Sequence, residues 1–417
     1  MKAFKQIFTI LTILVAFVGA KADNGTNSPY SRYGLGILTN QSLGINRQMG
    51  GLGYGLRSDS YINIINPASF SQADTLTMLF EAGFTLQDVY FKENGKGTNA
   101  LNASFDYIAM QFRLCKGLGM SIGFLPFSNV GYTFSSTANE GTIEEHTYTY
   151  AGTGGLYQPY IGIGWQPFKG LSLGATAAYI YGDITHEISD NLTNSEDDNY
   201  KIHSAKLKSY KVDFGLQYYA TIAKKHDFVL GATYSLGHSM HADAKTILYR
   251  GSEQTDTTKI TNGFKLPHTY GGGFTYCYDK QWKFGADYTF QQWGTSTFFG
   301  DDDMGIDRYK VSIGMEYAPN KPSNKYHKMI SYRGGVHFAQ PYTVVKGNNG
   351  CNEYGISAGL SLPIMNRNNK YNSALVHVSG QYIHMSPMSA GLIAENYFRL
   401  NIGITFNEAW FMKMKVK

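Results

Sequence analysis

The sequence TLTMLFEAGFTLQDVYF, residues 75–91, decides the fold. A strand with apolar residues at every second position turns one face to lipid and the other to water. The stretch has this pattern, with Leu76, Met78, Phe80, Ala82, Phe84 and Leu86 on one face and Thr77, Glu81, Gly83 and Thr85 on the other. It therefore predicts a membrane-spanning β-strand.

The same alternation recurs, interrupted by turns, almost to the end of the chain. Short turns at one end alternate with longer polar loops at the other, as in bacterial outer-membrane barrels. The predicted fold class is all-β: a transmembrane antiparallel β-barrel of about 14 strands over residues 75–417. The further strands are expected at 101–114, 118–135, 156–165, 171–188, 202–222, 227–244, 263–278, 281–298, 306–318, 328–345, 351–364, 370–385 and 396–411.

The first 22 residues are typical of a secretory signal peptide. Lys2 and Lys5 precede an apolar stretch, and Ala20-Lys21-Ala22 offers a cleavage site between small residues. The apolar stretch is shorter than the roughly 20 residues that a transmembrane helix requires. We therefore expect residues 1–22 to be removed on export and the mature chain to reside in the bacterial outer membrane, since a closed barrel satisfies its backbone within lipid.

Composition agrees with that class. The chain holds 32 Tyr and 47 Gly, and aromatic residues make up 15% of it. Aromatic girdles at the two membrane interfaces account for such a content. The formal charge of +5 depends largely on lysines of the leader, and the remainder shows no basic cluster. Nucleic acid is therefore not expected as a partner.

An irregular head precedes the strands. Residues 47–70 read RQMGGLGYGLRSDSYINIINPASF, without a helical or strand period. Gly50, Gly51, Gly53 and Gly55 permit backbone conformations closed to other residues, and the Asn66-Pro67-Ala68 sequence predicts a turn. We expect residues 23–74 to form a plug, or hatch, inside the barrel.

The predicted third strand contains a proline. Its run of Met120, Ile122 and Phe124 is interrupted by Pro126. Proline cannot donate to a β-ladder and is normally confined to edges and bulges. A break is expected there.

Charged residues recur on the face of the strands opposite to the lipid. Two hypotheses fit them: a structural network that holds the plug, or a set of groups that steers a polar head group. The residues are Glu81, Arg113, Asp213, Asp287, Glu316, Arg333, His337 and Glu353.

No catalytic residue, metal site or cofactor is predicted. Ser357 lies in a Gly-x-Ser-x-Gly sequence, but that motif requires a sharp strand-to-helix turn, whereas this one lies within an alternating strand. The acidic clusters at residues 196–198 and 301–303 lack the fixed spacing of a calcium loop. Cys115, Cys277 and Cys351 are too far apart in sequence for a metal-ligand spacing. We expect a protein that is not an enzyme.

Taken in order, these features resemble the FadL family of outer-membrane channels for long-chain fatty acids and hydrocarbons. The resemblance rests on Met49-Gly50-Gly51 and Asn66-Pro67-Ala68 ahead of the first strand, followed by the run of strands. The ending at residues 406–411 resembles that of such proteins from Bacteroidetes. The resemblance implies a hatch, a ligand site near the extracellular side, and a kink in the third strand that opens the wall sideways. In this sequence the resemblance puts the kink at Phe124, Leu125, Pro126 and Phe127.

The function that this implies is passive uptake of hydrophobic molecules across the outer membrane. The expected partners are outer-membrane lipid and a hydrophobic ligand such as a fatty acid or hydrocarbon, and the chain is expected to be a monomer. The alternative is a related barrel that binds proteins or assists secretion and transports nothing.

Overall fold

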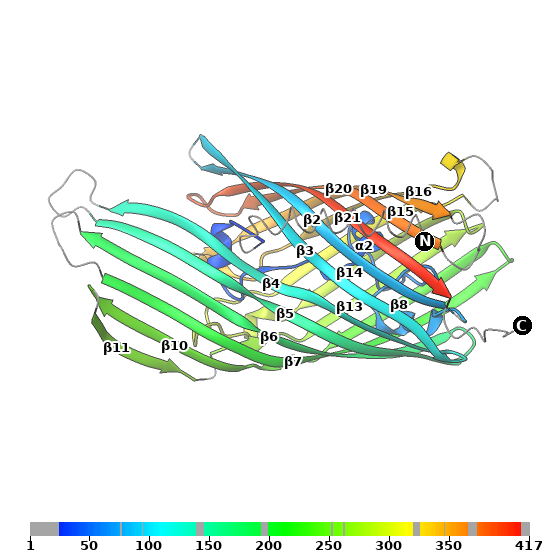
Figure 1. The fold of residues 1–417 in the computed structure, drawn as a ribbon, viewed down its shortest axis with the longest axis horizontal. Helices are drawn as coiled ribbons and strands as arrows, with labels where there is room; N and C mark the ends of the chain where they lie inside the picture. Colours follow the sequence, from blue (N-terminus) through cyan, green and yellow to red (C-terminus); the bar gives the residue numbers. More distant parts are fainter. Residues whose placement is uncertain are drawn as a thin grey trace, which may run out of the picture.

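The structure, a computed structural model, describes residues 25–75, 77–93, 95–138, 146–192, 199–251, 253–261, 263–319, 326–345, 347–365 and 373–409. Within them, 14 antiparallel strands form a closed barrel (Figure 1). The first of these strands, β2 (Thr77–Glu93), pairs with the last, β21 (Ala394–Ala409), and so closes the wall. Between them run β3 (Lys96–Cys115), β4 (Leu118–Ala138), β5 (His146–Phe168), β6 (Leu171–Leu192), β7 (Asn199–Ile222), β8 (His226–Ser235), β13 (Thr269–Tyr278), β14 (Trp282–Gln291), β15 (Arg308–Tyr317), β16 (Ser331–Ala339), β19 (Cys351–Met365) and β20 (Ser373–Pro387).

The fold predicted from alternation is confirmed, and each predicted strand overlaps one barrel strand. Residues 227–244 were expected to form one strand, but the structure divides them among β8, β9 (His238–Ser239) and the start of β10 (His241–Arg250). Between the strands predicted at 227–244 and 263–278, the polar residues 245–262 were expected to form a loop, and this expectation is wrong in part. These residues form a hairpin of β10 with β11 (Glu253–Ile260), which extends the outer half of β7.

The two ends of the barrel differ. One end, here the turn end, carries the tight connections that follow β3, β5, β7 and β13. The other, the loop end, carries the extended parts of β5, β6 and β7 together with β10 and β11 (Figure 1). Five short elements lie in the connections: β12 (Lys265–Leu266), β17 (Val344–Val345), β18 (Asn348–Asn349) and the 3-10 helices η3 (Trp293–Thr295) and η4 (Tyr326–Lys328).

The outer face of the wall is apolar and rich in aromatic residues. Because these side chains stay exposed in the isolated chain, lipid is the environment that suits them. No described helix is long and apolar enough to span a membrane. The exposed aromatic residues include Tyr157, Tyr179, Tyr181, Tyr210, Tyr270 and Tyr382 toward the loop end and Trp165, Phe168, Tyr218 and Trp282 toward the turn end.

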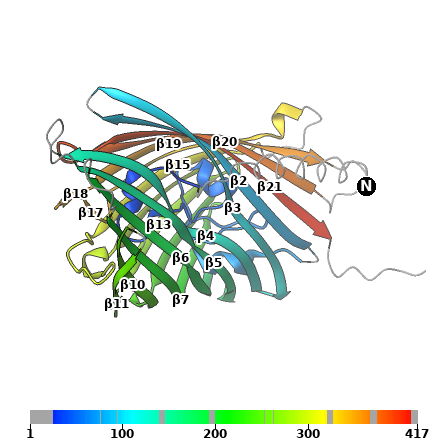
Figure 2. The same cartoon turned by 60° about the vertical axis from the view of Figure 1, so that its left-hand side comes forward.

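Residues 25–75, the N-terminal segment, run through the barrel interior (Figure 2). The segment holds four short elements: η1 (Pro29–Arg32), β1 (Ile37–Leu38), α2 (Gly44–Gln48) and η2 (Pro67–Gln72). Helix α2 contacts β16, β19, β20 and β21, whereas η2 contacts β4 to β7 on the other side of the ring. The segment therefore bridges the interior from wall to wall.

The glycines of the segment have two different roles. Gly50 and Gly51 have φ values of +69° and +85°, which other residues rarely adopt. Gly53 and Gly55 do not have positive φ, contrary to expectation, and they are needed for space. A Cβ at Gly53 would lie 2.3 Å from Ile65, and one at Gly55 would lie 2.8 Å from backbone of β13.

Asn66 fixes the turn that leads into η2. Its Oδ1 accepts from the backbone N–H of Ala68 at 3.1 Å, which caps the helix. Its Nδ2 donates to the carbonyls of Tyr54 and Leu216, at 2.9 and 3.1 Å. Pro67 at the first helical position completes the cap. Asn66 thus connects two parts of the segment, near Tyr54 and Ala68, and links the segment to β7.

Candidate ligand cavity

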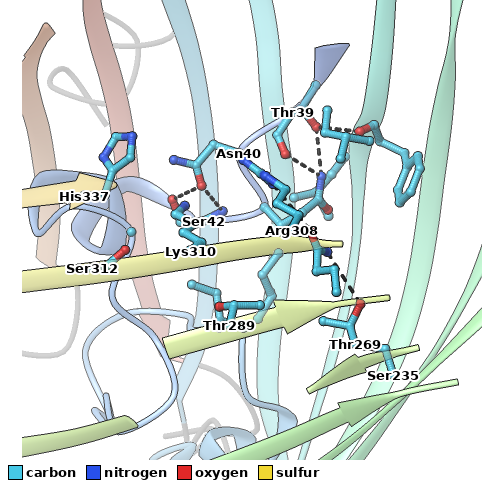
Figure 3. A pocket seen from close by; sticks show the side chains of 18 of the residues that line it. Thr39, Asn40, Ser42, Ser235, Thr269, Thr289, Arg308, Lys310, Ser312 and His337 are labelled. Carbon is cyan, nitrogen blue, oxygen red and sulfur yellow. Dashed lines mark hydrogen bonds between the residues drawn. The ribbon is translucent and has the colours of Figure 1, made fainter. Parts of the chain in front are cut away.

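A cavity of about 280 Å³ lies between the N-terminal segment and the barrel wall (Figure 3). Residues 37–42 of the segment form one side, and side chains from twelve barrel strands, β4 to β21, form the others. A smaller cavity of about 70 Å³ adjoins it toward the loop end and shares Ile37, Leu38, Arg308, Glu353 and Met385 with it. Together they extend from mid-barrel toward the loops.

Above the cavity, connections of the loop end pack into an apolar cluster. The indole of Trp293 is 1% exposed and lines the cavity roof. It packs against Phe298 and Tyr342, with ring centroids 5.9 and 4.8 Å away. Burial of the Tyr342 phenol raises its pKa, so the hydroxyl stays neutral. It accepts from the backbone N–H of Leu35 at 3.2 Å, which joins the roof to the segment.

Cations outnumber carboxylates in the cavity lining. Figure 3 shows Arg308 and Lys310, both from β15, beside the stretch of the N-terminal segment that carries Thr39, Asn40 and Ser42. Four cationic side chains line the cavity against three carboxylates. The cations are Lys211, Arg308, Lys310 and Arg399; the carboxylates are Asp213, Asp287 and Glu353.

The three carboxylates are already engaged. Asp213 pairs with Lys211. Glu353 accepts from His337 Nε2 at 2.8 Å and lies 3.5 Å from Arg308 Nη2. Asp287 Oδ2 accepts from two backbone N–H groups of the segment, those of Gly53 and Tyr54, at 2.6 and 3.0 Å.

Two cations, Lys310 and Arg399, form no ion pair with a carboxylate among the described residues. Within the part of the chain that the structure describes, Lys310 Nζ has no hydrogen bond or ion pair. Arg399 donates to the neutral amide of Gln87 at 2.6 Å and lies over the ring of Tyr397. Because four cations face three carboxylates in this cavity, its lining favours a ligand that carries negative charge.

The cavity also has an apolar lining. It is formed by residues of the segment, of β4, β5 and β6, and of β20 near the end of the barrel. Two of them, Leu125 and Phe127, flank Pro126 in β4. The apolar lining consists of Ile37, Leu38, Ile64, Ile65, Leu125, Phe127, Tyr160, Ala178, Ile383 and Met385.

At Pro126 the wall changes. The β3–β4 ladder runs only from the pair Cys115–Leu118 to the pair Ile108–Phe124, two residues before the proline. Toward the loop end the two strands diverge, and the β2–β3 hairpin leans away from β4 (Figure 1). The β4–β5 ladder continues past the proline, with a register shift between Pro126 and Ser128. We call this divergence of β3 from β4 the seam.

The β4 side of the seam is covered from inside by the N-terminal segment. Strand β1 pairs with Ser128 and Asn129. Thr39 donates from its backbone N–H to the Phe127 carbonyl at 3.0 Å and from its hydroxyl to the Pro126 carbonyl at 2.6 Å. Beyond Pro126, the segment therefore hydrogen-bonds the edge of β4. Nearer the turn end, β3 bonds that same edge.

Most predicted lumen charges lie against the N-terminal segment or the cavity. Glu81 accepts from the Ile62 N–H at 3.3 Å. Arg333 donates to Gln48 Oε1 at 3.0 Å and pairs with Glu316, which also accepts from Lys283. Asp213, Asp287 and Glu353 line the cavity. Arg113 contacts only the last residue of the segment: it donates to Thr75 Oγ1 at 2.7 Å and to the Cys115 carbonyl near the turn end.

A further cation anchors the segment near the turn end. Arg57 donates to Ser172 Oγ at 2.7 Å and lies over the Tyr219 ring. Burial lowers the pKa of Arg57 to about 10, so the side chain stays protonated at neutral pH. Charged side chains therefore link the segment to three strands: Arg57 links it to β6 and β7, and Arg333 links it to β16.

Ser357 has a structural role. Its hydroxyl donates to the Gln48 carbonyl at 3.1 Å and accepts from the Gly50 N–H at 3.0 Å. It lies within β19, without the turn that a nucleophile requires. Among described residues, no three His, Cys, Asp or Glu side chains group as metal ligands, and all three cysteines are free thiols. The acidic cluster at 196–198 lies outside the described residues, as does the predicted leader.

Sequence reasoning missed the cations of the cavity. Lys211, Arg308, Lys310 and Arg399 were not among the predicted lumen residues. A signal was present, since Lys310 alternates with the outward Tyr309 and Val311. Only the three-dimensional arrangement shows which of them lack a carboxylate.

The closed wall, the segment that crosses its interior and the cavity between them define a barrel of the FadL type. The sequence matches the BamG family over residues 3–417, and the chain belongs to that family. The expected resemblance is thus confirmed for the fold.

Solved structures with this fold include hydrocarbon channels. The Pseudomonas putida toluene transporter TodX is 15% identical, with 90% of this chain and 100% of that chain covered and a TM-score of 0.60. The CymD monoaromatic hydrocarbon channel is 14% identical, with 88% and 98% covered and a TM-score of 0.57. A Pseudomonas aeruginosa FadL homologue is 9% identical, with 90% and 99% covered and a TM-score of 0.54. No curated protein matches the sequence.

Proposed function

We propose that the chain is an outer-membrane channel for passive uptake of hydrophobic molecules with an anionic head group, such as long-chain fatty acids. One observation carries the proposal. The cavity combines two cations that form no ion pair within the described residues, Lys310 and Arg399, with an apolar lining that reaches Leu125 and Phe127 at the seam. An amphiphile matches such a lining, with its head at the cations and its tail toward the seam.

The ligand leaves sideways through the seam. Each methylene that passes from water to an apolar surface gains about 0.8 kcal/mol, so a long acyl chain favours lipid over a watery lumen. Phe124, Leu125, Pro126 and Phe127 form the gate in this proposal, because the β3–β4 ladder ends there. Solved structures with this fold include a toluene transporter and a monoaromatic hydrocarbon channel, which supports a hydrophobic ligand for this chain.

The N-terminal segment acts as the hatch. It bridges the interior, is fixed by hydrogen bonds from barrel strands, and leaves a cavity of about 280 Å³ beside the wall. Deleting residues 47–70 is then expected to raise leakage of small hydrophilic solutes from liposomes. Unchanged leakage would contradict the hatch. The residues that shape it are Gly50, Gly51, Gly53, Gly55, Asn66, Pro67 and Ala68.

The cellular setting follows from the same proposal. The protein is exported by its leader, residues 1–22, inserts as a monomer and contacts outer-membrane lipid through its aromatic wall. Mass spectrometry of lipids that co-purify with the protein would identify the ligand. Recovery of an anionic amphiphile supports the proposal; recovery of only bulk membrane lipid, in bulk proportions, contradicts it.

The head-group site is tested with Lys310→Met. Met keeps the length of the side chain and removes its charge, so uptake of a labelled long-chain fatty acid should fall several-fold. Uptake of a neutral alkane of equal length should not change. Lys206→Met is the matched control, because Lys206 is exposed on the outer face of β7 and does not line the cavity. Equal loss for acid and alkane would contradict a head-group role.

A further inference from the structure

A groove of about 620 Å³ lies on the outer face of the wall, across five adjacent strands in the order β19, β20, β21, β2 and β3. We call it the outer groove. The seam lies between β3 and β4, so an occupant of the outer groove leaves the proposed exit open. The apolar and small residues that line the groove include Leu86, Leu101, Ile356, Ala358, Gly380 and Phe398.

Two small residues form the floor of the outer groove. On one face of a sheet, directly opposite residues of neighbouring strands stand side by side in rows. One such row consists of Ala358, Gly380, Leu400 and Leu86, and its first two members have little or no side chain. No atom lies within 4 Å of a Cβ built at Gly380. The floor is therefore open space.

Large apolar side chains border this floor. The next row toward the loop end includes Ile356 and Phe398, which are 56% and 55% exposed. The same row continues to Leu101, which lies on the leaning β2–β3 hairpin and is 82% exposed. These side chains give the groove apolar walls that face the surroundings of the barrel.

Hydrocarbon surrounds this face when the barrel is inserted in a membrane. Because lipid tails are as apolar as leucine, van der Waals packing rather than the hydrophobic effect decides what binds there. A gap along the walls loses contacts outright. A flexible chain of methylenes follows a concave surface and touches it on several sides, so it fills the outer groove better than a rigid or branched molecule.

The outer groove is polar on its loop-end side. One row beyond Tyr382 stand His384 and Asn396, which face each other across β20 and β21. Asn396 Oδ1 accepts from the Tyr382 hydroxyl and from His384 Nδ1, both at 2.8 Å. Among the described residues, Asn396 Nδ2 has no hydrogen-bond partner, so it is free to donate to a ligand. An apolar floor with a donor at one end matches an acyl chain that ends in an ester.

We propose that the outer groove binds one ester-linked acyl chain of an outer-leaflet lipid. The methylenes lie along Gly380 and Ala358, and the ester carbonyl accepts from Asn396 Nδ2. The loop end places this ester in the outer leaflet, because outer-membrane barrels turn their longer loops to the outside. The inference rests on the membrane setting in the proposed function but not on transport, since the groove lies outside the barrel.

A second copy of this chain fits the outer groove less well. A dimer with two-fold symmetry presents the same patch on both partners. Two hollows at Gly380 would then face each other, and the space between them would stay unfilled. A dimer that is lost when Gly380 is enlarged is therefore an outcome that contradicts a lipid.

The test compares Gly380→Leu with Gly272→Leu in the full-length protein, by native mass spectrometry after purification from its membrane. Leucine at 380 fills the groove without a clash. Gly272 is the matched control, because it alternates with the exposed Tyr270 and Phe274 on β13, has no atom closer than 4.0 Å to a Cβ built there, and does not line the groove. Heat-modifiable mobility shows that each variant is folded.

Wild type and Gly272→Leu should each retain one diacyl lipid per barrel, and Gly380→Leu should retain several-fold less. Equal retention in the two glycine variants, no retained lipid in any of them, or a dimer lost only in Gly380→Leu would overturn the proposal. Lys310→Met separates this lipid from a ligand of the internal cavity, since it should lower retention of the cavity ligand alone. Failure at the outer groove thus leaves the transport proposal standing.

Asn396→Leu tests the polar end of the outer groove. Leucine has nearly the same shape as asparagine but cannot donate. After exchange into diacyl phosphatidylcholine or its dialkyl ether analogue, wild type should retain several-fold more of the diacyl lipid, and Asn396→Leu should retain the two lipids equally. A diacyl preference that persists in Asn396→Leu, or no preference in wild type, would overturn the role of the ester.

Discussion

Arg47 Nη1 lies 2.6 Å from Asp106 Oδ2, and less than a tenth of either side chain is exposed. Arg47 belongs to α2, inside the barrel. Asp106 is the extra residue of a bulge in β3, between the pairs Tyr107–Gly83 and Phe105–Phe84. The ion pair therefore joins the N-terminal segment to the wall where β3 starts to leave β4.

Arg47→Met should loosen this joint. Removing one partner of a buried ion pair leaves the other charge uncompensated, which costs about 3–5 kcal/mol. We expect a lower unfolding midpoint in urea and faster leakage of small solutes from liposomes. The double variant Arg47→Met/Asp106→Leu should recover part of the lost stability, because no buried charge remains. A double variant as unstable as the sum of the single ones would contradict this account.

Gly50→Ala should destabilise the segment for two reasons. The φ of +69° is unfavourable for alanine, at a cost of about 1 kcal/mol, and the new Cβ would lie 2.7 Å from the Val336 carbonyl oxygen. Gly95→Ala separates the two effects. Gly95 has a φ of +80°, but no atom lies within 4 Å of a Cβ built there. Equal losses in unfolding midpoint for the two variants would mean that the contact with β16 contributes nothing.

The sequence predicted the wall well because lipid imposes alternation on every strand that crosses it. The stretch from Thr77 to Leu86 shows the rule: its outward residues are apolar, and its inward ones, apart from Leu79, are polar or small. Strand β11 escaped prediction for the converse reason. Its residues are polar on both faces and almost fully exposed, so no period of two distinguishes them from a loop.

The seam and the cavity were predictable only in part. Pro126 signals an irregular strand from its lack of an N–H, but the sequence does not say which neighbour β4 loses. In the structure, β4 stays paired with β5 beyond Pro126 but is no longer paired with β3. Strand β1 pairs with β4 there instead. Likewise Lys310 is visible as an inward residue, yet its lack of a carboxylate depends on side chains from other strands.

Ser357→Ala tests the role of the Gly-x-Ser-x-Gly sequence. Loss of the hydroxyl leaves the buried N–H of Gly50 unpaired, so stability should fall by about 1–3 kcal/mol. Ser128→Ala is the matched control, since Ser128 is fully buried but its hydroxyl has no partner in the described chain. Hydrolysis of a chromogenic ester that disappears in the Ser357 variant alone would refute a structural role.

Pro126→Ala tests the gate. The proline offers no N–H to a neighbouring strand, whereas alanine offers one and lets β4 straighten through the register shift that precedes Ser128. We expect the β3–β4 ladder to lengthen, amide exchange at residues 101–107 to slow, and uptake of a labelled fatty acid to fall several-fold. Pro159→Ala is the control, because Pro159 lies opposite Phe124 on β5, away from the open side of β4. Slower exchange with undiminished uptake would show that the seam is not the exit, and unchanged exchange would show that the proline does not hold it open.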